Sequence, residues 1–120
     1  MVVERLKRTE ERVIVHEMAH KVVGGQYAGA IRYSYTRGPD GKLYITGGEV
    51  SIDVFEEDTP EGTIRKMEIV KRAALAPSDP SPQDYAVAQK ATIQEMKARL
   101  ELLQKYFSNR GKRVGSINKV

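Results

Sequence analysis

Residues 16–20 read HEMAH, an HExxH motif, and this segment constrains the fold more than any other. Two histidines four positions apart share one face of a helix, about one turn apart, so the motif requires a helix here. The flanking sequence agrees, because apolar residues recur at helical spacing between Leu6 and Gly24. Gly24 and Gly25 favour an end, since glycine readily takes the left-handed conformation that terminates helices. We therefore expect a first helix over residues 3–23.

The HExxH pattern carries a specific chemistry. His16 and His20 can bind one zinc ion from the same helical face. Glu17 would face the remaining coordination position, where a carboxylate acts as general base on water. The chain has no cysteine, so the metal ligands must be nitrogen or oxygen atoms. The motif predicts a zinc-dependent metalloendopeptidase with Glu17 as its catalytic residue.

A zinc site needs a third protein ligand, and the chain contains only two histidines. The extended metzincin motif would place a histidine six residues after His20, where this chain has Gln26. The acids of the later helices do not form an ExxxD pattern: Glu61, Glu68, Asp84, Glu95 and Glu101. Glu49 is the predicted third ligand, because Gly47-Gly48 before it lets the backbone approach the first helix closely. Asp53, on the same strand face, is the second choice.

The residues after the first helix change to strand spacing. Apolar and polar residues alternate over 31–36, and the turn signal GPDG at 38–41 precedes a returning strand over 42–46. The two glycines that follow are expected to break that strand. Residues 49–55, with Val50, Ile52 and Val54 on one face, are then expected to form a third strand. The pattern predicts a small antiparallel three-stranded meander.

Two further helices are expected after the meander. Thr59-Pro60 and Ser81-Pro82 each combine an N-cap residue with a proline suited to the first helical turn. The last helix carries an apolar seam at three-four spacing: Ile93, Met96, Leu100, Leu103 and Phe107. Either the other helices or a second subunit must cover this seam, so a homo-oligomer through this helix is one expectation. The predicted fold is α+β: HExxH helix, three-stranded meander, then two helices, in a minimal zincin-like arrangement.

The basic charge is concentrated at the end of the chain. Residues 105–120 hold five basic residues and no acid, whereas the whole chain has a net charge of +4. We expect a single domain over residues 1–108 and a basic, flexible tail over 109–120. No apolar stretch approaches the ~20 residues of a membrane span, and no signal peptide is seen. A cytoplasmic location is therefore predicted.

Several segments together resemble one protein family. HEMAH, then GGQYAG, GPDGKLY, GGEVSIDV and RAALAPSDPSPQD are similar to the SprA-related family of bacterial proteins, whose HExxH motif implies zinc metallopeptidase activity. The resemblance spans about residues 13–104. It implies a zincin-like site at His16, Glu17 and His20, and it singles out the triplet Gly48-Glu49-Val50.

Three functions are compatible with the sequence. The first is a zinc peptidase acting on a polypeptide substrate laid along the edge of the meander. The second is a non-catalytic, zinc-stabilised protein-interaction module; four protein ligands would favour it, and an open coordination position would favour the peptidase. The third is nucleic-acid binding by the basic tail. The chain has no recognition motif and few aromatic residues beside its basic ones, so no specific nucleic-acid partner is expected.

Overall fold

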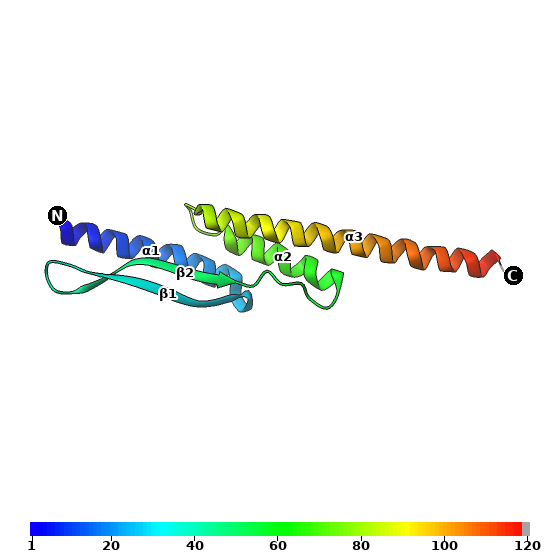
Figure 1. Ribbon diagram of the computed structural model, residues 1–120, viewed down its shortest axis with the longest axis horizontal. Coiled ribbons are helices and arrows are strands. Elements are labelled where there is room, and N and C mark those ends of the chain that lie inside the picture. The colour runs from blue at the N-terminus through cyan, green and yellow to red at the C-terminus, as the bar shows by residue number, and fades with distance from the viewer. Residues whose placement is uncertain (119–120) are drawn as a thin grey trace.

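The computed structural model describes residues 1–118, with side chains described as far as residue 110. The elements follow in the order α1 (Val2–Gly24), the short 3-10 helix η1 (Gly25–Tyr27), β1 (Ala28–Arg37), β2 (Leu43–Ile52), α2 (Pro60–Ala74) and α3 (Pro82–Asn118). The hairpin of β1 and β2 lies along α1, and α2 lies between α1 and α3 (Figure 1). The molecule is a rod with extents of 85 × 19 × 15 Å; the start of α1 and the turn between β1 and β2 lie at one end, and the second half of α3 forms the other (Figure 1).

Local sequence signals set the ends of the helices. α1 ends at Gly24, and Gly25 follows with a positive φ of 54°, as glycine permits. Thr59 caps α2, because its Oγ1 accepts the Gly62 N–H at 3.0 Å, and Pro60 occupies the first turn. The predicted helix starts and the turn at residues 38–41, which contains Gly41 at φ 81°, are confirmed.

The prediction of a third strand is wrong. β2 runs without interruption from Leu43 to Ile52, and the described residues form one two-stranded antiparallel sheet. Gly47 and Gly48 stay in the strand, opposite Ser34 and Tyr33 of β1. The register shifts beside them, between Ser34 and Tyr35, so the irregularity that glycine introduces is a bulge and not a break.

Gly48 nevertheless allows β2 to approach α1 closely, as expected of the glycine pair. A Cβ atom at this position would lie 2.9 Å from Glu17 Cγ and 3.2 Å from Val13 Cγ1. Any side chain here would push either these two side chains or the hairpin away. The missing side chain thus sets the distance between β2 and the HExxH helix.

The core lies where α2 meets α3 and the end of the hairpin. Its fully buried residues are Met67, Val70 and Ala91. Tyr27, Ile52 and Val54 pack against them from the hairpin side. This packing fixes α2 between the other two helices, and the N-terminal end of α3 lies beside the C-terminal half of α1.

The end of the chain is described only in part. α3 continues to Asn118, whereas Lys119, Val120 and the side chains beyond residue 110 lie outside the description. The predicted basic tail at 109–120 falls mostly there, and its role stays a prediction. Among the described helices, none is both long enough and apolar enough to cross a membrane.

Candidate metal centre

The HExxH residues of α1 face the interior of the molecule. Glu17 is 5% exposed and His20 is 3% exposed, whereas His16 lies nearer the surface and is half-buried. The two imidazole rings stand 5.0 Å apart between centroids, at an angle of 77°. The four-residue spacing therefore brings both rings to one place, as predicted.

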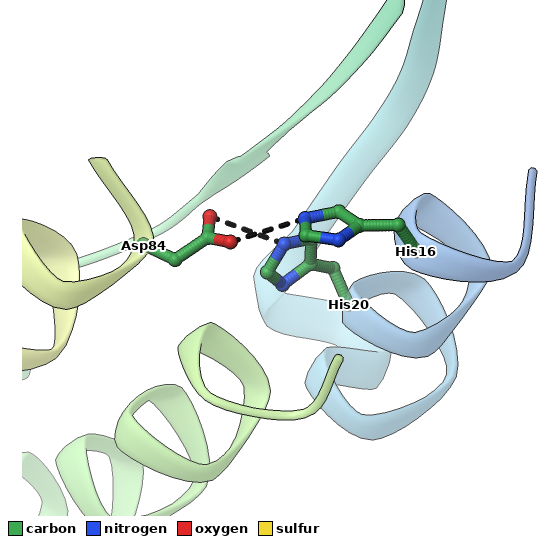
Figure 2. A group of neighbouring side chains, drawn as sticks. All are labelled: His16, His20 and Asp84. Carbon is green, nitrogen blue, oxygen red and sulfur yellow. Dashed lines mark hydrogen bonds and ion pairs between the residues drawn. The ribbon is translucent and has the colours of Figure 1, made fainter. Parts of the chain in front are cut away.

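A carboxylate from the other end of the chain completes this group. Asp84, in the first turn of α3, places Oδ2 3.1 Å from His16 Nε2 and Oδ1 3.2 Å from His20 Nε2. Figure 2 shows the carboxylate directed at both rings. His16, His20 and Asp84 are the group of possible metal ligands found among the described residues, with one ligand atom from each within 4.8 Å of the others.

The start of α3 determines where the Asp84 carboxylate points. Ser81 and Asp84 form a reciprocal capping pair: the Asp84 N–H donates to Ser81 Oγ at 3.1 Å, and the Ser81 N–H donates to Asp84 Oδ2 at 2.9 Å. The helix N-terminus also favours a negative charge at this position. The carboxylate is thereby held in one orientation before any metal binds.

A hydrogen bond on the far side of the ring fixes the tautomer of His20, whereas His16 has a carboxylate beside each of its two ring nitrogens. The Nδ1–H of His20 donates to the carbonyl oxygen of Ala73 at 2.8 Å, in a buried position. His16 Nδ1 lies 3.3 Å from Asp79 Oδ1. His16 Nε2 lies within hydrogen-bond distance of Asp84 Oδ2, at 3.1 Å. With its proton on Nδ1, His20 directs the Nε2 lone pair at the other carboxylate oxygen, Asp84 Oδ1, so two acceptor atoms face each other at 3.2 Å. A cation between them removes that repulsion, and this is the usual outer-shell arrangement of metal-binding histidines.

The distances suit a tetrahedral ion. Zinc binds imidazole nitrogen and carboxylate oxygen at about 2.0–2.2 Å, which gives ligand-to-ligand edges of about 3.3–3.6 Å. The two contacts of Asp84 with the histidines, 3.1 and 3.2 Å, are near this length but come from its two different oxygens, and one ligand atom from each of the three residues lies within 4.8 Å of the others. Two nitrogens and one oxygen from three protein ligands are also the donor set of catalytic zinc sites that keep a fourth position open. The residues fit zinc.

Glu17 lies at the edge of this group with no hydrogen-bond partner of its own. Its Oε1 is 3.9 Å from His16 Nε2, and its Oε2 is buried without a hydrogen-bond partner. Burial raises the pKa of Glu17; His16 and His20 oppose the rise, and Asp84 and Glu49 add to it. A buried carboxylate with a free oxygen beside the histidines has the position expected of a general base.

The group opens into a cleft of about 460 Å³. Its walls come from the HExxH face of α1, from residues 48–52 of β2 and from the first turn of α3. Since Glu17, His16 and His20 all line one wall, a ligand in the cleft would lie beside all three residues.

Glu49 lies in the cleft wall but not in the convergent group. Glu49 is exposed and lies near enough to Glu17 to raise the pKa of that carboxyl, but none of its atoms belongs to the group formed by His16, His20 and Asp84. Its role as a ligand stays a prediction. Asp53 lies elsewhere: its Oδ2 is 2.8 Å from Lys66 Nζ, and it does not line the cleft.

Asp84 is a candidate ligand that no metal-binding pattern in the sequence singles out. Its local signal was present, because Ser81 and Asp84 have the spacing of a capping pair. That spacing predicts a helix start but does not say which other helix the start will face. The contact with α1 depends on α2 packing between the two, which no local pattern reveals.

Comparison with known proteins identifies one family. The model of the SprA-related family matches residues 1–110. No curated protein matches the chain, and no solved structure does so.

Proposed function

The chain belongs to the SprA-related family, and from that premise we propose that it is a zinc-dependent metalloendopeptidase with a zincin-like site. The observation that carries the proposal is the convergence of His16, His20 and Asp84 beside a buried carboxylate, Glu17, whose second oxygen has no partner. Each of the four side chains lines the same cleft. His16, His20 and Asp84 would hold the ion, so Asp84 takes the place that sequence reasoning gave to Glu49.

The four side chains divide the work of peptide hydrolysis between them. Zinc held by the first three would supply Lewis acidity, which polarises water and the substrate carbonyl. Glu17 takes a proton from the water as its oxygen forms a bond to the carbonyl carbon. Glu17 then gives that proton to the amide nitrogen as the C–N bond breaks, which leaves a carboxyl and an amine. Burial assists these transfers, because a raised pKa makes Glu17 a more effective proton acceptor and donor near neutral pH.

The substrate we propose is an extended polypeptide segment. β2 pairs with β1 and with no other strand of the described part of the chain, so one side of β2 is without a strand partner. Residues 48–52 of this strand line the cleft that holds the HExxH residues. A peptide added along β2 would use main-chain hydrogen bonds and lie with an amide beside Glu17.

One observation favours a second function, a zinc-stabilised interaction module without turnover. The convergent group joins α1 to the first turn of α3, and these helices are otherwise separated by α2 (Figure 1). An ion held there would link α1 to the first turn of α3 and so stabilise the fold. The two functions differ in what they require of Glu17, which the module does not need.

Glu17→Gln separates the two functions. The amide cannot accept a proton, so we expect the variant to bind zinc as the wild type does and to cleave an unfolded protein substrate about 10²–10⁴-fold more slowly. Glu11→Gln, the same change at an exposed position of α1, is the matched control and should cleave normally. Equal cleavage by the wild type and Glu17→Gln, both loaded with zinc, would reject the peptidase and leave the module.

A further inference from the structure

α3 has its small residues inside and its large apolar residues outside. Its buried apolar residues are alanines: Ala88, Ala91 and Ala98. The residues of the predicted seam are exposed by half or more: Ile93 58%, Met96 61%, Leu100 60%, Leu103 50% and Phe107 58%. This distribution is the reverse of what burial of apolar surface favours for a helix in water.

α2 cannot cover the exposed seam. At about 100° per residue, the seam is centred about 140° around α3 from the alanine face that packs on α2. The second half of α3 also extends past the end of α2, so no other element of the described chain lies beside it (Figure 1). The seam therefore needs a partner from outside this chain.

The spacing of the seam identifies the kind of partner. Its residues follow each other at intervals of three, four, three and four, which is the a/d repeat of a two-stranded coiled coil. Such a seam is self-complementary, because a two-fold axis across it pairs the same residues in both chains. We infer that α3 pairs with α3 of a second copy of this chain to form an antiparallel dimer.

The charges beside the seam suit a second copy and not a charged partner. Lys97 Nζ is 2.7 Å from Glu56 Oε1, and Arg99 Nη2 is 2.9 Å from Glu95 Oε2, so both flanking cations are paired within their own chain. Two copies can then approach without bringing uncompensated like charges together. An acidic partner would find these two cations already engaged.

The antiparallel direction follows from the residue that continues the seam. Three positions after Phe107 comes Arg110, and a parallel pair would bring the two Arg110 side chains together. An antiparallel pair moves them to opposite ends of the interface. It also pairs Leu100 of one chain with Leu103 of the other, and Met96 with Phe107, so that the four central layers are apolar and Ile93 lies opposite Arg110 at each end.

The surface available is sufficient for a specific dimer. Five large side chains with half or more of their surface exposed offer about 500 Å² of accessible area per chain. The aliphatic parts of the flanking Lys97 and Arg99 side chains, together with Tyr106, raise this area to about 600–800 Å². Full coverage of these surfaces in two chains would bury at most about 1,200–1,600 Å², against the roughly 1,000 Å² that a specific interface needs.

Sedimentation equilibrium of the 120-residue chain tests the pairing. The wild type should approach the mass of a dimer as its concentration rises, and Leu103→Glu should remain a monomer with unchanged helical content. Lys105→Glu is the matched control: it introduces the same acid two residues away, outside the seam, and should still dimerise. A wild type that stays monomeric up to its solubility limit would overturn the inference, and so would a Leu103→Glu variant that dimerises like the wild type.

Disulfide cross-linking tests whether the two α3 helices run antiparallel. Because the chain has no cysteine of its own, every disulfide must come from the introduced residues. In an antiparallel pair, Met96→Cys chains mixed with Phe107→Cys chains should form mixed disulfides. Phe107→Cys chains alone should form few, since their sulfurs lie at opposite ends. Efficient cross-linking of Phe107→Cys alone, with none in the mixture, would overturn the antiparallel arrangement.

Discussion

His20 has the most restricted surroundings of the convergent side chains. Its ring is 3% exposed, its Nδ1–H donates to the Ala73 carbonyl, and its Nε2 faces Asp84. The contact that orients the His16 ring from its outer side is weaker, because its partner there, Asp79, is itself 66% exposed. At the scale of single residues, the two histidines thus differ in how firmly their rings are oriented.

Asp79→Ala tests whether the contact between Asp79 and His16 contributes to zinc affinity. Loss of the carboxylate should leave His16 free to rotate, and such outer-shell changes typically weaken metal binding by 10–100-fold. Since Asp79 is largely exposed, we expect the lower end, about 10-fold, in a competition titration with a zinc chelator. Asp58→Ala, at an exposed position outside the cleft, is the control. An Asp79 variant with wild-type affinity would mean that His16 is oriented by packing alone.

A second ion pair away from the cleft governs stability in acid. Lys66 is 2% exposed, and its hydrogen bond to Asp53 lowers the pKa of that carboxyl below its usual value. A lowered pKa contributes stability above the unfolded-state pKa of about 3.9, and the contribution is lost as the pH falls through the folded-state pKa.

Asp53→Asn should therefore destabilise the protein most above about pH 5, by about 0.5–1 kcal/mol, because the Asp53 side chain is 44% exposed and solvent screens the pair. Below about pH 4 its unfolding curve should approach that of the wild type, because the wild-type carboxylate is also being protonated there. Urea unfolding at several pH values measures this. A stability difference that does not change with pH would contradict the assigned ion pair.

At the scale of elements, the close contact of β2 with α1 depends on one missing side chain. Gly48→Ala would place a methyl group 2.9 Å from Glu17 Cγ and 3.2 Å from Val13 Cγ1, so either these side chains or the hairpin must shift. We expect a loss of about 1–3 kcal/mol in the free energy of unfolding. Gly47→Ala is a matched control one residue away, where the nearest atom would be Ser34 Cβ at an ordinary 3.5 Å.

Chemical denaturation of the two variants decides whether this contact matters. Gly48→Ala should unfold at a lower urea concentration than Gly47→Ala. If both variants unfold together, the effect would come from glycine flexibility alone, and the packing of β2 on α1 would not be as tight as described.

The same glycines mark where reading elements from the sequence fails. A glycine pair in a strand pattern fits a break, a bulge or a close approach equally well, and only the pairing with Ser34 and Tyr33 distinguishes them. Helix starts were predictable, because Thr59 and Ser81 act within three residues of themselves. Features set within one helical turn could thus be predicted from the sequence. The irregularity in β2 could not, because it depends on the register with β1.

At the scale of the whole molecule, the candidate centre joins residues more than sixty positions apart. The HExxH helix was predictable because His16 and His20 are neighbours on one turn. Asp84 was not, because its approach to them depends on how α2 packs between two helices. The exposed seam of α3 was recognisable as a surface that needs a partner, although the sequence alone left open whether another helix of the chain covers it.

The central claim is that His16, His20 and Asp84 bind one zinc ion, and calorimetric titration of zinc into chelator-treated protein tests it most directly. The wild type should bind one zinc per chain. His20→Ala and Asp84→Ala should each weaken binding by more than about 100-fold, because each removes a ligand. Glu49→Gln should bind like the wild type, since its side chain lies outside the convergent group. Wild-type binding by Asp84→Ala together with loss of binding in Glu49→Gln would contradict the ligand set, and unchanged binding by His20→Ala would contradict the metal centre itself.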